Sequence, residues 1–223
     1  PSTAAAAAIA DPTHLVAIAP CVGDDDPDDG CWVDVARDVG LLAWRRPLES
    51  AEIERLVAVA EAGAAWSLDE GVGVPFEQGL KYEIMAMLQS PHFLYLVEVG
   101  SPDPEDPSRR VLGSYELASR ISFFIQGRSP GRAFLQDVAL GLLDTPDGVR
   151  QATRELLQSQ NAGAKLDAFW GELFFVDDLA NLSKDPEAFP EFDAALAASM
   201  REETLRFMRD LVWKRDADVR EMF

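Results

Sequence analysis

The apolar residues of this chain recur every three or four positions over most of its length, which is the spacing of one face of an α-helix. In the first half of the chain this pattern covers residues 32–43, 53–64 and 76–88. Prolines lie between these segments and not inside them, as expected because proline removes a hydrogen bond from a helix interior. The sequence therefore predicts three helices in this half.

The same spacing continues through the second half of the chain. Thr145 followed by Pro146 is a typical helix start, since threonine caps the first turn and proline fits the first helical position. Leu15–Ala19 is the one candidate for a short strand. We therefore predict an all-α fold, a compact multi-helix domain of about eight or nine helices with little or no strand. The helical segments in this half are 117–125, 134–142, 149–157, 166–174 and 196–211.

A loop divides these helices into two groups. Residues 100–113 hold three prolines among mixed charges, and this composition predicts a linker loop. The linker separates a first helical module at 21–99 from a second at 114–223. Residues 1–20 are expected to be the tail of a preceding helical segment. The chain stops inside an apolar-periodic segment, so we expect the second module to be truncated at its C-terminal end.

The charge of the chain excludes one class of partner. The chain carries 39 Asp and Glu against 20 Lys and Arg, a formal net charge of −19. Nucleic-acid binding needs Lys and Arg clustered at the phosphates, so we exclude nucleic acid as a partner. No apolar run approaches the roughly 20 residues of a transmembrane helix, so no membrane span is predicted.

Cys21 and Cys31 bracket an Asp-rich loop. Two cysteines that flank one loop favour a disulfide, which implies an oxidising compartment, periplasmic or extracellular; two free thiols are the alternative. Asp24, Asp26 and Asp28 have the alternating spacing of the first ligands in a calcium-binding EF-hand loop. The Gly and the Glu that such a loop needs further on are absent, which favours a solvated acidic loop over a calcium site.

Residue types that carry chemistry are scarce. The two histidines, His14 and His92, have no partners at metal-ligand spacing. No nucleotide-binding or nucleophile motif occurs. We therefore nominate no catalytic, cofactor-binding or metal-binding residue, and we expect a structural His92 rather than a general base. The identity of any small-molecule substrate stays open.

Two pairs of charged residues carry a structural prediction. Glu116 and Arg120 lie four apart on a helix, which predicts a partly buried ion pair at the edge of the core; substrate anchoring by Arg120 is the alternative. Arg45 and Arg46 precede Pro47 at a helix end. Arginine side chains there satisfy terminal carbonyl groups, and anion binding is the alternative.

Four aromatic residues lie near the end of the segment 166–174. Phe169, Trp170, Phe174 and Phe175 have helical spacing. Such a set belongs to a core more often than to a cofactor-binding surface, so we predict that it packs inside the fold.

Three segments resemble known families. Residues 44–48 (WRRPL), followed by Glu52, resemble the A-[FYW]-R-R-P-[LV]-T-x-x-E signature of domain-of-unknown-function family 1595. Residues 88–95 (LQSPHFLY), followed by Glu98, resemble the opening of domain-of-unknown-function family 1592, and residues 114–124 (SYELASRISFF) are similar to a helix of that family. The motif residues are Arg45, Arg46, Pro47, Ser90, Pro91, Phe93, Tyr95, Glu98 and Tyr115.

The resemblance implies a setting but no reaction. Such domains occur in large secreted proteins of planctomycetes and myxobacteria, often beside c-type cytochrome or carbohydrate-binding modules. The scarcity of ligand residues predicts no cofactor in this segment, and the resemblance places any haem c in neighbouring domains of the parent chain. We expect a non-catalytic helical scaffold or interaction module of a secreted or periplasmic protein, whose partners are other segments of the same parent. The alternative is part of an extracytoplasmic enzyme, redox, cytochrome-linked or polysaccharide-directed, whose reactive groups lie mainly outside this segment.

Overall fold

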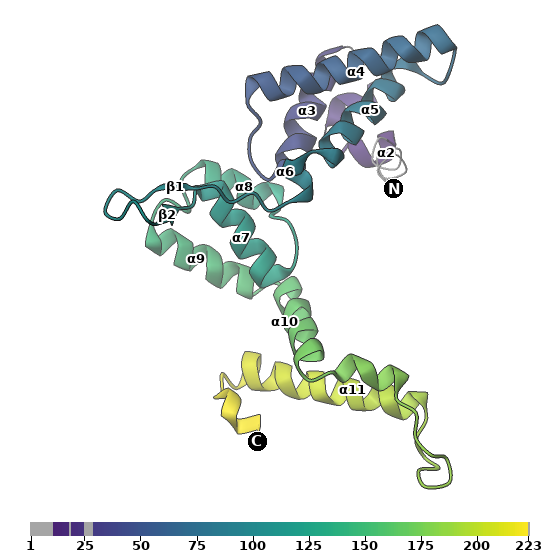
Figure 1. Cartoon of the computed structure of the whole chain (residues 1–223), viewed down its shortest axis with the longest axis vertical. Coiled ribbons are helices and arrows are strands. Elements are labelled where there is room, and N and C mark those ends of the chain that lie inside the picture. The colour runs from purple at the N-terminus through teal and green to yellow at the C-terminus, as the bar shows by residue number, and fades with distance from the viewer. Residues whose placement is uncertain (1–10, 18, 25–28, 223) are drawn as a thin grey trace. The chain divides into compact units, whose positions relative to one another are not determined.

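The computed structural model describes residues 11–17, 19–24 and 29–222, and it is largely all-α, as predicted (Figure 1). Among these residues, eight helices are seven or more residues long. They are α3 (Asp29–Trp44), α4 (Ser50–Glu70), α5 (Pro75–Gln89), α7 (Ser114–Gln126), α8 (Arg132–Ala139), α9 (Pro146–Leu157), α10 (Gln160–Leu173) and α11 (Ala194–Arg209). The shorter segments are α2 (Pro12–Leu15), α6 (Pro91–Leu94), the 3-10 turns η1 (Pro20–Gly23), η2 (Val176–Asn181) and η4 (Val219–Met222), and the π turn η3 (Asp210–Lys214).

The strands of the described residues lie in the predicted loop. Strands β1 (Ser101–Pro102) and β2 (Arg110–Val111) pair antiparallel as a small hairpin. The predicted strand at Leu15–Ala19 is wrong. Leu15 ends helix α2, and the Ala19 N–H donates to the Leu15 carbonyl at 2.8 Å, so this segment turns instead of extending.

The chain forms two compact units. Unit 1 holds the residues up to Phe123 together with Arg128–Val149, and unit 2 holds Phe124–Gly127 and the residues from Arg150 onward. The division therefore runs through α7 and α9, and not through the predicted linker. Contacts far apart in sequence explain why the segment after the hairpin joins unit 1, for example the ion pair between Arg132 Nη1 and Asp38 Oδ1 at 2.8 Å.

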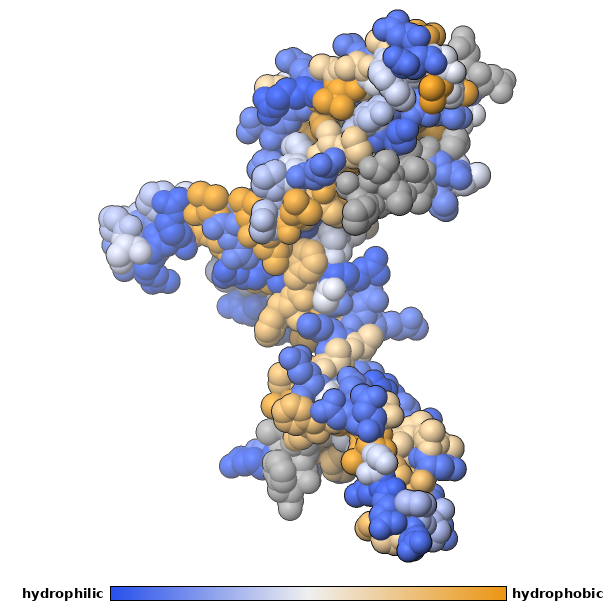
Figure 2. Space-filling view, turned by 45° about the vertical axis from the view of Figure 1, so that its right-hand side comes forward, coloured by the Kyte–Doolittle hydropathy of each residue, from blue (hydrophilic) through white to orange (hydrophobic). Residues whose placement is uncertain are grey.

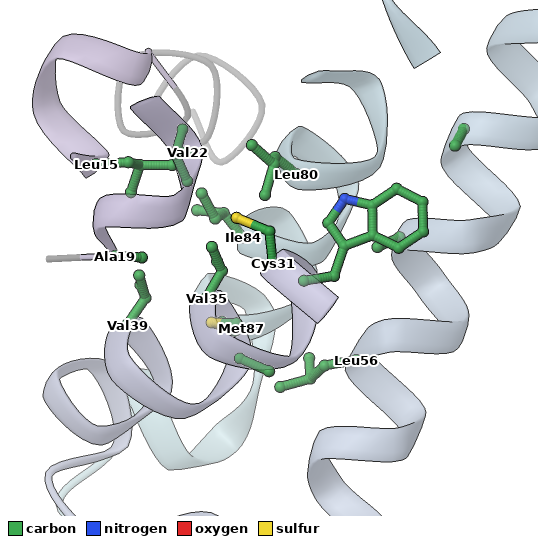
Figure 3. Close-up of a cluster of buried hydrophobic side chains, with 14 of the residues drawn as sticks. Leu15, Ala19, Val22, Cys31, Val35, Val39, Leu56, Leu80, Ile84 and Met87 are labelled. Atoms are coloured by element: carbon green, nitrogen blue, oxygen red, sulfur yellow. The ribbon is translucent and has the colours of Figure 1, made fainter. Parts of the chain in front are cut away.

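The core of unit 1 lies between α3, α4 and α5 (Figure 3). Helices α4 and α5 pack closely because Gly79 has no side chain: a Cβ there would lie 2.9 Å from both the Ala60 carbonyl oxygen and the Trp32 ring. The N-terminal turns close the core from one side. The labelled side chains in Figure 3 are Leu15, Ala19, Val22, Cys31, Val35, Val39, Leu56, Leu80, Ile84 and Met87, all buried.

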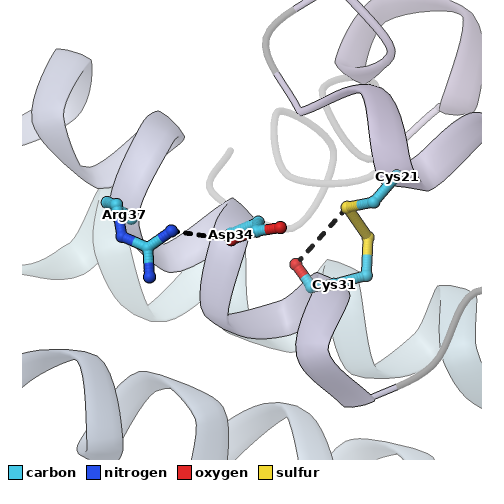
Figure 4. The surroundings of a disulfide bond; sticks show 4 residues. All are labelled: Cys21, Cys31, Asp34 and Arg37. Carbon is cyan, nitrogen blue, oxygen red and sulfur yellow. Dashed lines mark hydrogen bonds and ion pairs between the residues drawn. A yellow bond between two sulfur atoms is a disulfide. The ribbon is translucent and has the colours of Figure 1, made fainter.

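A disulfide joins Cys21 to Cys31, with 5.6 Å between the Cα atoms (Figure 4). The predicted bridge is confirmed, and the alternative of free thiols is wrong. The bond ties η1 to the first turn of α3, so it holds the N-terminal turns against the core. Asp26 and Asp28 of the acidic loop lie outside the described residues, as does the run Ala4–Ala8.

Unit 2 has a smaller core. One cluster of its buried residues consists of Trp170, Leu205, Met208 and Leu211, contributed by α10, α11 and η3. Side-chain caps start its two longest helices. The Ser159 hydroxyl accepts from the Ala162 N–H at 3.2 Å, and Asp193 Oδ1 accepts from the Leu196 N–H at 2.7 Å.

Candidate functional site

Arg45 directly follows helix α3, and its side chain binds three backbone carbonyl groups. Its backbone adopts a left-handed conformation with φ of 60°, a common way for a helix to end. Its guanidinium donates to the carbonyl oxygens of Ala43 at 3.1 Å, His92 at 2.5 Å and Tyr95 at 2.9 Å. The side chain therefore ties the end of α3 to α6, as the prediction of a carbonyl-binding arginine requires.

Arg46 and Glu52 form a second link across Pro47. Two guanidinium nitrogens of Arg46 bind the two carboxylate oxygens of Glu52, each at 2.8 Å. Glu52 Oε2 also accepts from the backbone N–H of Glu49 at 2.8 Å, so Glu49 and not Ser50 is the N-cap of α4. The hydrogen bond from Arg46 outweighs partial burial and lowers the pKa of Glu52 to about 2.

Ser90 and Pro91 start helix α6 and place the ring of His92. The Ser90 hydroxyl accepts from the His92 N–H at 3.2 Å. The imidazole ring lies 5.0 Å from the Trp44 ring, centroid to centroid, and its Nε2 lies 3.5 Å from Arg46 Nη2. These contacts favour the structural role expected for His92.

The predicted ion pair between Glu116 and Arg120 is wrong. Arg120 pairs with Glu98 instead, with 2.9 Å between Arg120 Nε and Glu98 Oε1. The Arg120 side chain is 56% exposed, so it is not buried either. The chain between α6 and α7 folds back along α7 and brings Glu98 beside Arg120. Arg120 therefore pairs with Glu98, and Glu116 binds other groups.

Glu116 binds backbone N–H groups. Its carboxylate accepts from Val99 at 2.7 Å, Gly100 at 3.1 Å and Gly113 at 2.7 Å, on both sides of the hairpin. Partial burial acts to raise the pKa of Glu116, but the N–H groups of Gly100, Gly113 and Val99 outweigh it and the pKa is lowered. Glu116 therefore closes the hairpin onto the start of α7.

These segments enclose a cavity of about 100 Å³ in unit 1. Several motif residues line it, whereas the rings of Phe93 and Tyr95 are largely exposed. Tyr95 takes part through its carbonyl oxygen, which Arg45 binds. The lining residues are Trp44, Arg45, Arg46, His92, Leu96, Val97, Tyr115, Glu116 and Ser119.

Comparison with protein families accounts for the motifs. Residues 112–223, just over half of the chain, match the model of the family PSD4, described as Protein of unknown function (DUF1592). The chain belongs to this family. Residues 31–98 match a second model, PSD5, described as Protein of unknown function (DUF1595). No curated protein and no solved structure matches the chain.

The cavity is built from both matched segments. Trp44, Arg45 and His92 lie in the DUF1595 match, whereas Tyr115 and Ser119 lie in the DUF1592 match. The motif at 88–98 falls inside the DUF1595 match, so its comparison with the opening of DUF1592 was wrong. The two sequence families thus meet around one small cavity within unit 1.

Glu83 is not among the residues that the sequence singled out. Its side chain is fully buried in α5, and neither carboxylate oxygen has a hydrogen-bond partner among the residues that the structure describes. Burial raises its pKa to about 9, so the group is neutral at pH 7. Its position three residues after Leu80 and four before Met87 places it on the buried face, and that spacing was the available signal.

Only one of the four aromatic residues of unit 2 packs in the core, so their predicted common burial is wrong. Trp170 is buried and stacks on Phe174 with ring centroids 5.5 Å apart. Phe169 is 51% exposed and Phe175 is 73% exposed. In Figure 2, hydrophobic residues show at the surface of the part that carries α10 and α11.

The described ranges contain no group of three or more His, Cys, Asp or Glu side chains placed to hold a metal ion. Over the same residues, no helix combines the length and apolar character that crossing a membrane requires. Neither His14 nor His92 therefore belongs to a possible metal site in the part of the chain that the structure describes.

Proposed function

We propose that this chain is a helical interaction module of a larger extracytoplasmic protein, and that the exposed aromatic residues of unit 2 contact the partner. The partner is another segment of the same parent protein. The proposal rests on a contrast between the motif side chains of unit 1 and the aromatic side chains of unit 2. The side chains of Arg45, Arg46 and Glu116 form hydrogen bonds that position helices and the hairpin, whereas the rings of Phe169 and Phe175 face water.

One residue carries the proposal. Phe175 has a left-handed backbone with φ of 54°, and its ring is 73% exposed. A left-handed conformation costs a non-glycine residue about 1–2 kcal/mol, and an exposed ring gains nothing from burial. The left-handed backbone directly follows the C-cap of α10, so it serves to end that helix, as it does at Arg45. The exposed ring adds little to the stability of unit 2, and large exposed apolar groups mark interaction surfaces.

The disulfide supports the location. Cysteine pairs persist in oxidising compartments and are rare in the cytosol. The Cys21–Cys31 bond therefore favours a periplasmic or extracellular protein.

A glycine substitution tests the proposed contact surface. Phe175→Gly removes the ring and relieves the left-handed backbone, so we expect an unchanged or higher Tm together with weaker binding of a hydrophobic dye and less self-association in sedimentation. Asp216→Gly is the matched control, because Asp216 also has a positive φ, of 46°, but no ring. It should leave dye binding and association unchanged.

Two results would contradict the proposal. A fall of several degrees in Tm for Phe175→Gly would show that the ring packs within the fold. Turnover of a polysaccharide or of a redox substrate by the purified chain would favour the enzyme alternative.

A further inference from the structure

Arg45 is a buried arginine with no acidic partner among the described residues of the chain. Arg45 is 7% exposed, and its three hydrogen bonds all go to carbonyl oxygens. Among the residues that the structure describes, no carboxylate forms an ion pair with it. The chain holds 39 acidic residues, and the more exposed Arg46, Arg120 and Arg209 each bind at least one.

Burial of a cation without an anion is costly, because carbonyl dipoles replace only part of its hydration. Burial accordingly lowers the pKa of Arg45. A guanidinium has five N–H donors, and the three bonds to Ala43, His92 and Tyr95 leave two of them without an acceptor in the described part of the chain. The side chain thus retains both charge and donors for a further group.

The cavity beside Arg45 provides the space. Its volume of about 100 Å³ admits a small ion or several waters, but not a drug-sized ligand, which needs about 300 Å³ or more. Arg46, Tyr115 and Ser119 add polar groups to its wall.

The acidic groups near the cavity are engaged elsewhere. Glu52 is bound by both terminal nitrogens of Arg46. Glu116 lines the cavity, but its oxygens accept from the N–H groups of Val99, Gly100 and Gly113. Neither carboxylate is thus available as the partner of Arg45.

We propose that this cavity binds a single carboxylate group, with the Arg45 guanidinium as its charge partner. A monoanion of this size fits the volume, whereas a dianion such as hydrogen phosphate is opposed by the net charge of −19. The carboxylate belongs either to a small organic acid or to the C-terminus of a peptide, which share this chemistry. The site does not depend on the aromatic surface of unit 2.

Titration of the whole chain with acetate tests the site. At pH 7 and constant ionic strength, millimolar sodium acetate should shift the amide and indole signals of Trp44 in a ¹⁵N spectrum and raise the Tm, whereas sodium chloride should not. A short peptide with a free C-terminus, compared with its amidated form, distinguishes the two sources of the carboxylate. Equal responses to acetate and chloride up to about 100 mM would overturn the proposal.

Two variants locate the bound group. Arg45→Met should abolish the acetate response, and Arg132→Met, which removes an arginine that binds Asp38 in the same unit, should retain it. Since Arg45→Met also loses three carbonyl contacts, Ser119→Val serves as a second variant that narrows the cavity and keeps Arg45. A folded Arg45→Met or Ser119→Val chain that responds to acetate as the parent does would overturn the proposal.

Discussion

Unit 1 and unit 2 keep themselves folded by different means. In unit 1 three long helices bury a continuous apolar core, which a disulfide closes on one side. In unit 2 a smaller cluster of four buried residues joins α10, α11 and η3. An ion pair links the same two helices: Asp167 of α10 binds Arg209 of α11, with 2.8 Å between Arg209 Nε and Asp167 Oδ1.

The two units differ in how much of their apolar surface is buried. Unit 2 is not poor in aromatic residues, but Phe169 and Phe175 are exposed while Trp170 alone is buried. Because hydrophobic stabilisation scales with the area removed from water, these exposed rings add little to unit 2 by itself. Its stability should therefore depend strongly on each buried side chain.

The largest expected effect is the unfolding of unit 2. Leu211 is fully buried in its core. Leu211→Ala should cost about 3 kcal/mol, enough to unfold a unit with so small a core, while unit 1 stays folded. Hydrogen exchange checks this: protection should disappear from α10 and α11 and persist in α3, α4 and α5.

The matched change in unit 1 is Leu80→Ala, also at a fully buried position. It should lower the protection of unit 1 without abolishing it. Loss of protection in both units from Leu211→Ala would contradict the separation into two independently packed cores.

Glu83 offers a pH test of the core of unit 1. Its pKa is about 9 in the folded chain and about 4.3 in an unfolded one. As the pH rises between these values, the unfolded chain loses the proton while the folded chain keeps it, so stability falls. Glu83→Gln removes this effect and should stabilise unit 1 at pH 7 by about 4 kcal/mol, with little gain at pH 4.

Urea unfolding at pH 4, 7 and 8 measures this gain. Glu77→Gln is the control on the same helix, because Glu77 is exposed and should change nothing. A gain that does not depend on pH would mean that Glu83 is ionised in the folded chain.

Removal of the disulfide tests whether stability can be lost in unit 1 without a change in unit 2. Opening the bond between Cys21 and Cys31, which closes a loop with a sequence separation of 10, should cost about 3 kcal/mol through the entropy of the unfolded chain. The loss should be confined to unit 1. Thermal unfolding with and without a reducing agent, followed by hydrogen exchange in each unit, gives the result; a shift in unit 2 would argue against this picture.

The smallest effects concern Glu116 and Arg120. Glu116→Ala leaves three backbone N–H groups without their acceptor and should cost about 1 kcal/mol. Arg120→Ala removes only an exposed ion pair with Glu98, so its Tm should stay unchanged. Thermal melts of both variants suffice, and a larger loss for Arg120→Ala would restore the core role first predicted for it.

Much of the fold was predictable because its causes are local. The helices follow from apolar spacing, and Thr145 with Pro146 marks the start of α9, where the Thr145 hydroxyl accepts from the Gly148 N–H at 3.2 Å. The Cys21–Cys31 bond and the hydrogen bond from Arg45 to the Ala43 carbonyl also follow from neighbours in sequence, whereas the bonds from Arg45 to His92 and Tyr95 join distant segments. The scaffold role and the parent protein stay predictions.

The sequence by itself determined the positions of the helices, their caps and the disulfide, since each depends on residues within about ten positions of one another. Only the tertiary structure decided that Arg120 pairs with Glu98, that Glu83 is buried without a partner, and that the segment 128–149 joins unit 1. The reason is physical. Helical periodicity shows which face of a helix is apolar, but which groups meet across 20 or more residues depends on how the helices pack.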